Sequence, residues 1–328
     1  MASREVASGH DTGEPGHNAG STSDAVTSVK VAVRVRPLVG KETAAGCQEC
    51  LVTDDDNSQV VAAGDRCFQF DYVFGTESSQ ESVYQRTTRP LVERFIEGYN
   101  ATVFAYGQTG SGKTFTVGNA YTVNGRPEDA GIIPRVAVDI FRQVKELQAK
   151  GIKATVAVSF LEVHNEEIND LLGGDQADGG AGGKGGEKGL ALRENLTGEV
   201  VVAGLSQHQV EGPEGLDHLL ERGALCRATA STNMNHHSSR SHAICTLNLE
   251  VGAGGGQEGF ETVTASKFHL VDLAGSERAK KTGAEGQRLR EGININKGLL
   301  ALGNVISALS AGVEGNGAGG GGGGGGGV

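Results

Sequence analysis

The stretch Gly107-Gln108-Thr109-Gly110-Ser111-Gly112-Lys113-Thr114 decides the fold of this 328-residue chain. It matches the phosphate-loop pattern G-x-x-x-x-G-K-[ST] at every fixed position. The apolar run 101–106 in front of it is typical of a buried strand, and a helix is expected to begin near Lys113. A strand, a glycine loop and a helix in this order predict an α/β domain that binds phosphate groups.

The residue types of this loop explain how it would hold a nucleoside triphosphate. Glycines lack a Cβ, so the backbone can fold around an anion and direct its N–H groups at phosphate oxygens. Lys113 supplies a positive charge for the terminal phosphates, and Thr114 supplies a hydroxyl for the Mg²⁺ that accompanies the nucleotide. The alternative, a glycine-rich turn with an incidental Lys-Thr, is disfavoured by the complete pattern and its context.

Composition excludes several other classes of protein. The formal net charge of −11 argues against general binding to nucleic acid or to membrane surfaces. The N-terminus has no apolar signal-peptide core, and no run of 18 apolar residues occurs, so we expect a soluble intracellular protein. Cys47 and Cys50 form a C-x-x-C, but no second ligand pair follows at zinc-site spacing, which favours ordinary thiols over a metal or redox site.

Hydrophobic periodicity along the chain predicts alternating strands and helices around the loop. We expect strands at 29–37, 67–74, 154–163, 243–251 and 262–273, and a hairpin of 190–193 with 199–202. Helices are expected at 82–96 with a kink near Pro90, and at 132–148, 165–172 and 214–228. Residues 1–27 and 312–328 are expected to be disordered, with a flexible glycine-rich insertion at 173–189. This order predicts a central mixed, mostly parallel sheet with helices on both faces.

A second motif completes the phosphate site. The run Lys267-Phe268-His269-Leu270-Val271-Asp272 is apolar up to its terminal acid, as a Walker B strand requires, because the carboxylate must sit beside Mg²⁺ at the sheet edge. Gly275 follows and lets a backbone N–H approach the γ-phosphate. The alternative is an aspartate that caps the turn after a strand.

A third polar run is Asn235-His236-His237-Ser238-Ser239-Arg240-Ser241-His242. With the phosphate loop, the run Asp272-Leu273-Ala274-Gly275-Ser276-Glu277 and the strand Arg34-Val35-Arg36-Pro37, it makes four signatures, and the chain therefore resembles a kinesin motor domain over about residues 28–311. The run 292–309 is similar to kinesin-4 (chromokinesin) motors. The resemblance implies the phosphate-loop NTPase fold of the kinesin type.

The resemblance also implies roles for residues that match the family's motifs. It implies adenine contacts from Arg34, Arg36, Pro37 and, by stacking, Tyr84, although each alone would more often be structural. ATP phosphates would be held by Gln108, Thr109, Gly110, Ser111, Gly112, Lys113 and Thr114. Thr114 and Ser239 would bind Mg²⁺ directly, and Asp272 would bind it through water.

The same resemblance assigns the switching residues. Ser238 and Ser239 would position the attacking water, Gly275 would sense the γ-phosphate, and Arg240 would pair with Glu277 when the switches close. Such a pair is suitable because phosphoryl transfer depends on an ordered, closed site more than on covalent help.

The segment 277–297 carries six basic residues against three acidic ones, a local net charge of +3 in an acidic chain. Composition alone would favour an ordinary exposed loop. With the resemblance, this segment is expected to contact tubulin in microtubules, whose surface is acidic. We therefore expect a microtubule-associated protein of the cytoplasm and cytoskeleton, with no direct nucleic-acid contact from this chain and no membrane partner.

Two features depart from the family pattern. Ala101 stands where most kinesins have Gly, and the later family elements, including the neck linker and any dimerising coiled coil, do not follow residue 311. A missing central strand would be expected to lower stability. The first hypothesis is an ATP-driven microtubule motor domain that hydrolyses ATP; the alternative is a non-motile microtubule-binding nucleotide switch. A generic phosphate-loop kinase or GTPase is the third, and a guanine-binding N-K-x-D motif is absent.

Overall fold

The computed structural model describes residues 29–62, 66–118, 126–173, 190–196, 198–229, 239–253, 262–277 and 287–314. The chain forms one large unit, Lys30–Val305, and a second unit made of Met1–Val29 and Ile306–Val328. The predicted disordered segment 1–27 lies outside the described residues, as does nearly all of the predicted insertion 173–189. Helix α7, Gln287–Glu314, continues into the stretch predicted as a disordered tail from 312, because the sequence becomes glycine-rich only from Gly315.

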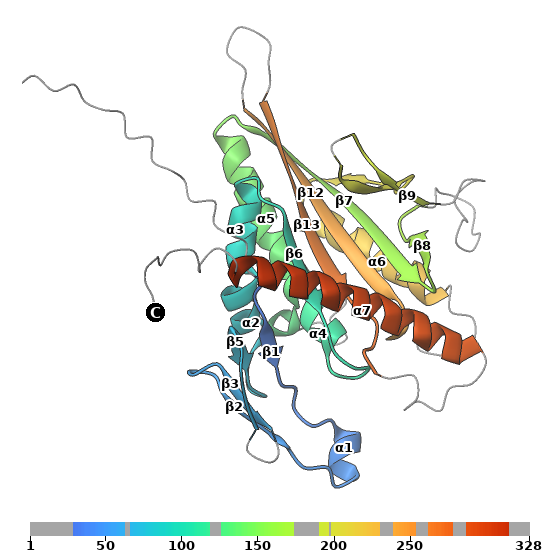
Figure 1. The fold of residues 1–328 in the computed structure, drawn as a ribbon. Coiled ribbons are helices and arrows are strands. Elements are labelled where there is room, and N and C mark those ends of the chain that lie inside the picture. The colour runs from blue at the N-terminus through green and yellow to red at the C-terminus, as the bar shows by residue number, and fades with distance from the viewer. Residues whose placement is uncertain are drawn as a thin grey trace, which may run out of the picture. The chain divides into compact units, whose positions relative to one another are not determined.

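A six-stranded sheet lies at the centre of the large unit (Figure 1). Its strand order is β11-β7-β12-β13-β6. Strand β8 pairs with the C-terminal end of β7, beyond the part that pairs with β11. The strands are β6 (Ala101–Ala105), β7 (Lys153–His164), β8 (Glu167–Asp170), β11 (His208–Val210), β12 (His242–Ala253) and β13 (Thr262–Asp272). The strands predicted before the phosphate loop, at 154–163, at 243–251 and at 262–273 are therefore confirmed.

The sheet is mixed, as predicted, but the expectation that it is mostly parallel is wrong for the described strands. Only β6 and β13 run parallel, whereas the pairs β7–β8, β7–β11, β7–β12 and β12–β13 are antiparallel. The connection from Ala253 to Thr262 explains one of these pairs. It is too short for the crossover that two parallel neighbours need, so β12 and β13 form a long hairpin.

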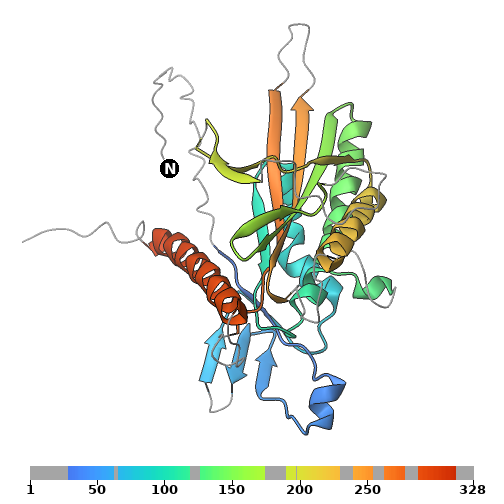
Figure 2. The same cartoon turned by 90° about the vertical axis from the view of Figure 1, so that its right-hand side faces the viewer.

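Helices flank the sheet on both sides. In Figure 2, α5 (Ile132–Ala149) and α6 (Pro213–Thr229) lie side by side on one face, and residues 287–305 of α7 lie on the other side. The buried positions of α5 recur every three or four residues, as an amphipathic helix requires: Ile132, Ile133, Val136, Ala137, Ile140, Phe141 and Val144. Within the described residues, no helix combines the length and the apolar composition needed to cross a membrane.

The predicted kinked helix is two helices, α2 (Gln80–Thr87) and α3 (Arg89–Ile96), separated at Thr88. Pro90 stands in the first turn of α3, where its missing N–H costs nothing. The inner face of α3 reaches the sheet, and Phe95 packs edge-on against Phe268 with ring centroids 5.5 Å apart. This contact ties the helical layer to the strand that ends in Asp272.

Smaller elements surround the sheet. Two-stranded sheets are formed by β1 (Ala32–Arg34) with β5 (Tyr72–Phe74), in parallel, and by the predicted hairpin of β9 (Ala191–Glu194) with β10 (Val200–Ala203). A three-stranded antiparallel sheet contains β2 (Leu51–Asp54), β3 (Gln59–Ala62) and β4 (Arg66–Gln69). The short helices are α1 (Gly40–Ala44), α4 (Lys113–Val117) and the 3₁₀ turn η1 (Pro127–Asp129).

Two local predictions are wrong. The helix expected at 165–172 is instead the strand β8, which turns back on β7. Asn165 and Glu166 have φ angles of 51° and 68°, the left-handed pair that a tight hairpin turn needs. The strand expected at 67–74 is divided between β4 and β5, because Asp71 leaves the first sheet and accepts hydrogen bonds from Val31 N (2.8 Å) and Lys30 Nζ (2.9 Å).

Candidate functional site

The phosphate loop connects β6 to α4 at one edge of the sheet. Because β6 and β13 are parallel neighbours with Ala105 opposite Asp272, the loop and the acid reach the same edge. Gly110 and Gly112 have φ angles of 79° and 96°, in a region that favours glycine. The predicted strand, loop and helix are therefore confirmed, and the backbone of the loop requires glycine at both positions.

Lys113 folds back over the loop. Its Nζ donates hydrogen bonds to the carbonyl oxygens of Gly107 (2.8 Å) and Gln108 (3.0 Å). Burial lowers the pKa of Lys113, and the charges of Asp272 and Glu277 oppose that shift. The ammonium is thus partly desolvated and is held in this structure by the loop carbonyls.

Thr114 and Asp272 meet behind the loop. Thr114 Oγ1 donates a hydrogen bond to Asp272 Oδ2 at 2.8 Å, which joins the first residues of α4 to the end of β13. Asp272 is 3% exposed, and burial raises its pKa despite the Thr114 hydrogen bond and the charges of Arg227 and Lys113. Its other oxygen, Oδ1, is buried and has no hydrogen-bond partner among the described residues.

An unsatisfied buried carboxylate oxygen is costly unless a ligand completes it. A threonine hydroxyl and an aspartate oxygen are also the ligands that Mg²⁺ prefers. The donor set at this edge therefore fits the cation predicted from the sequence. Ser239, the third predicted ligand, lies next to this edge, where its carbonyl oxygen accepts a hydrogen bond from Gly275 N (2.8 Å).

The segment after β13 closes against the phosphate loop. Ser276 N donates to Gly107 O at 3.1 Å, and both the N–H and the hydroxyl of Thr109 donate to the carboxylate of Glu277. A Cβ on Gly275 would overlap Thr109 Oγ1 and the Glu277 carboxylate, so a larger residue there would require these two side chains to move. Burial opposes the shift, but the hydrogen bonds from Thr109 lower the pKa of Glu277, which stays ionised.

The charge pair expected between Arg240 and Glu277 is not formed in this structure. Arg240 instead donates to Glu291 Oε2 on α7 at 3.0 Å, while Glu277 contacts Thr109. The prediction concerned a closed state, so the structure places both residues in other contacts and leaves that prediction open. Ser238, which belongs to the same polar run as Arg240, lies outside the described residues.

Arg34 and Arg36, for which adenine contacts were predicted, both have their guanidinium groups engaged by protein groups. Arg34 donates to Gln80 Oε1 (2.7 Å), Thr116 Oγ1 (3.0 Å) and Ser78 O (3.1 Å), and burial lowers its pKa. Arg36 donates through Nε to Gly110 O at 2.8 Å and through NH1 to the carbonyl oxygen of Pro37 at 2.9 Å. These contacts fix the strand β1 against the loop.

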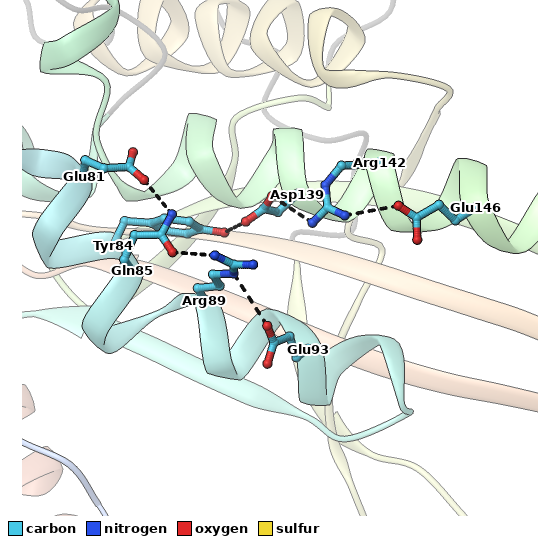
Figure 3. A network of polar contacts seen from close by, with 8 residues as sticks. All are labelled: Glu81, Tyr84, Gln85, Arg89, Glu93, Asp139, Arg142 and Glu146. Atoms are coloured by element: carbon cyan, nitrogen blue, oxygen red, sulfur yellow. Dashed lines mark hydrogen bonds and ion pairs between the residues drawn. The ribbon is translucent and has the colours of Figure 1, made fainter.

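The stacking of Tyr84 on adenine, which the family resemblance implied, does not agree with the position of this residue. The residue is 2% exposed within the helical layer, and its hydroxyl donates to Asp139 Oδ2 at 2.5 Å. Figure 3 shows Tyr84 pointing at Asp139, within a network of charged and polar side chains from α2, α3 and α5. Burial and Asp139 raise the pKa of Tyr84. Its ring is covered, so it cannot stack on a base.

Phe115 is the aromatic residue that the sequence analysis missed. It directly follows Thr114 in α4, the residue is 53% exposed, and the Arg34 guanidinium carbon lies 5.4 Å from its ring centroid. An exposed ring at the end of a phosphate-binding loop is a suitable surface for a nucleobase. Its place one residue after the Lys-Thr pair was the available signal in the sequence.

Comparisons with known proteins agree with this geometry. The family model for the kinesin motor domain matches residues 34–316. Kinesin-like protein kif7 of Danio rerio is 46% identical over 285 residues, covering 86% of this chain and 20% of the relative. Kinesin-like protein KIN-4C of Arabidopsis thaliana is 46% identical over 296 residues, and Chromosome-associated kinesin KIF4 of Mus musculus is 45% identical over 289. These alignments cover 86% and 88% of this chain and 22% of each relative.

Thus the chain spans about a fifth of the length of these relatives. Among solved structures, one described as a fast kinesin, with implications for ATPase mechanism and interactions with microtubules, is similar with a TM-score of 0.74 and 35% sequence identity. That match covers 87% of this chain and 76% of the solved chain.

Proposed function

Because the chain belongs to the kinesin motor domain family, we propose that it couples ATP binding and hydrolysis to microtubule binding and movement. Relatives named KIN-4 and KIF4 confirm the expected likeness to the kinesin-4 family. One observation carries the proposal: the phosphate loop, the buried Asp272 and the segment after β13 converge at one sheet edge. Membership of a motor family favours this function over the non-motile switch and over a generic kinase or GTPase. The proposed extent of the motor domain is 28–311.

ATP is proposed to bind with its phosphates on the loop 108–114. Lys113 would release its two loop carbonyls and turn to the terminal phosphates. Thr114, Ser239 and, through water, Asp272 would hold Mg²⁺, supported by the orphaned Oδ1 of Asp272. When bound, Mg²⁺ supplies positive charge beside the phosphates and helps to orient them.

The residues around the γ-phosphate are proposed to order the attacking water and to exclude bulk solvent. Ser238 and Ser239 would position that water, and Gly275 N–H would contact the γ-phosphate. Glu277 would then leave Thr109 and pair with Arg240, which closes the site. This role is supported by the position of Glu277 directly over the loop.

The adenine base is proposed to stack on Phe115, with Arg34, Arg36 and Pro37 lining its other sides. The exposed ring and its distance from the Arg34 guanidinium support this assignment. Tyr84 has no part in it, because its ring is buried in the helical layer.

Microtubules are the proposed partner, and the cytoplasmic microtubule cytoskeleton is the proposed location. The basic segment 277–297 is proposed to contact tubulin, because its charge of +3 is complementary to an acidic filament surface. The net charge of −11 supports tubulin over nucleic acid or membrane as the surface contacted by this segment. Since Glu277 begins this segment, a change at the γ-phosphate is transmitted to it along the backbone.

Steady-state hydrolysis of ATP by the full-length protein tests the proposal. We expect microtubules to raise the rate several-fold and Lys113→Ala to abolish the rise. A rate that is indifferent to microtubules, in protein that still binds ATP, would contradict the motor function. Competition of GTP against ATP checks the nucleotide, and ATP is expected to be preferred.

A further inference from the structure

Helix α1 contributes nothing to the hydrophobic core. None of its five residues, Gly40–Ala44, is buried. Polar contacts of Glu42 hold it instead: the carboxylate accepts hydrogen bonds from Val39 N at 3.0 Å and from the two terminal nitrogens of Arg36 at 2.7 Å and 2.6 Å. The Arg36 side chain lowers the pKa of Glu42 to about 2, so the carboxylate is charged at neutral pH.

The two-point pair with Glu42 determines where Arg36 directs its remaining nitrogen. Arg36 Nε donates to the carbonyl oxygen of Gly110, inside the phosphate loop, at 2.8 Å. A guanidinium is planar, so fixing its two terminal nitrogens on a carboxylate also fixes the direction of Nε–H. Glu42 therefore acts on the loop through Arg36 without touching the loop itself.

This hydrogen bond restrains one peptide plane of the loop at both ends. The carbonyl of the Gly110–Ser111 peptide accepts from Arg36, and its N–H donates to Gln108 O at 3.2 Å. The plane is rigid, so these two contacts fix its rotation. A loop with three glycines is otherwise free to adopt many conformations, and ordering them would weaken nucleotide binding.

Two other side chains that hold the first half of the loop, Lys113 and Glu277, are groups that the proposed cycle moves. Lys113 holds Gly107 O and Gln108 O but must turn to phosphate, and Glu277 holds Thr109 but belongs to the switch. Arg36 lies between β1 and α1, and its contact with Gly110 depends neither on Lys113 nor on Glu277. Its contact can persist in every nucleotide state.

We propose that Glu42 is a positioning residue for the nucleotide site, which holds Arg36 on the Gly110 carbonyl and so pre-organises the phosphate loop. The proposal rests on the proposed function in one respect, that the loop binds ATP and ADP. Because pre-organisation aids any phosphate chain equally, loss of Glu42 weakens ATP and ADP alike. It leaves the hydrolysis step nearly unchanged, since Glu42 lies outside the region where the γ-phosphate reacts.

The test is equilibrium binding of the fluorescent nucleotide mant-ADP to the full chain with Glu42→Gln. We expect its Kd to rise about tenfold, and KM for ATP to rise to a similar extent, with kcat within about twofold of the unaltered protein. Glu97→Gln is the matched control, because it removes a surface carboxylate that also pairs with an arginine, Arg94, at 2.8 Å. The melting temperatures of the two variants are expected to agree, since neither carboxylate is buried.

Arg36→Gln, alone and combined with Glu42→Gln, tests whether the effect passes through Arg36. The double variant is expected to bind mant-ADP no more weakly than Arg36→Gln. Additive losses, a kcat defect at unchanged KM, or a Glu42→Gln variant that binds like Glu97→Gln would each overturn the inference. If the unaltered protein fails to bind mant-ADP at all, the proposed function fails instead.

Discussion

Replacing Glu291 with Gln is expected to raise the rate of ATP hydrolysis in the absence of microtubules. In the structure Arg240 pairs with Glu291 on α7, and Glu277 accepts two hydrogen bonds from Thr109. The proposed closed site needs Arg240 and Glu277 to pair with each other. Both existing contacts must therefore break first, and Glu291→Gln removes one of them in advance.

The size of the effect follows from the exposure of this pair. The side chains of Arg240 and Glu291 are 30% and 18% exposed, at a separation of 3.0 Å. Ion pairs that remain partly solvated contribute up to about 1 kcal/mol. One kcal/mol corresponds to a factor of about five in an equilibrium constant, so closure becomes up to about fivefold more favourable. If closure limits hydrolysis, the rate without microtubules rises by the same factor.

The assay is steady-state phosphate release by the full chain without tubulin. Glu146→Gln is the control, because it breaks a comparable exposed pair with Arg142 (3.1 Å) on α5, away from the switches. A gain in rate cannot come from partial unfolding, which would lower it. Should Glu291→Gln hydrolyse ATP no faster than Glu146→Gln while melting at the same temperature, the exchange of partners proposed for Arg240 would be refuted.

Four further substitutions test separate parts of the site and the core. Phe115→Ala is expected to raise KM for ATP at least about fivefold with little change in kcat, since base stacking on an aromatic ring contributes about 1–3 kcal/mol. Tyr84→Phe is expected to leave KM unchanged and to lower the free energy of unfolding by about 1 kcal/mol in denaturant titrations; a higher KM would restore its adenine role. Thr114→Ala is expected to lower Mg²⁺-dependent hydrolysis about 10- to 100-fold, whereas Thr114→Ser retains the hydroxyl and the activity. Arg227→Ala is expected to cost about 3–5 kcal/mol of stability, because it removes the positively charged partner of the buried Glu162 carboxylate, and a loss below about 1 kcal/mol would contradict this.

The parts of the fold that were predicted correctly are those whose signal is local. The phosphate loop, the strand ending in Asp272 and helix α5 each show a complete pattern within a few turns or strand repeats. The edge at which loop and acid meet could be inferred because two parallel strands bring their carboxyl ends together. In these places, local preference and tertiary packing favour the same structure.

Local patterns failed where a distant partner decides the conformation. The run 165–172 has helix-like spacing of apolar residues, but it is short, and pairing of β8 with the long strand β7 supplies hydrogen bonds that an isolated helical turn cannot match. Likewise, the strand expected at 67–74 is divided because Asp71 binds the backbone of Val31, forty residues earlier. Neither partner is visible in the segment itself.

The site shows the same limit for side chains. Tyr84 and Phe115 are both aromatic residues of the segments around the loop, and composition cannot tell which ring is exposed. Burial against Asp139 removes Tyr84, while its place on the outer face of α4 leaves Phe115 available. The motif identified the residues proposed to hold phosphate, but only the packing of α2 against α5 shows that the Tyr84 ring is not available to a base.

The ionic partners of the switches could not be predicted from sequence for a different reason. Arg240 has two acidic partners in reach of the proposed cycle, Glu277 and Glu291, and the energies of such partly exposed pairs differ by about 1 kcal/mol or less. Bound phosphate or contacts of α7 can therefore decide which of the two pairs forms, and the identity of the charged residues does not. A near-balance between two partners is also what a switch needs, because a strongly preferred pair would hold Arg240 in one state whatever nucleotide was bound.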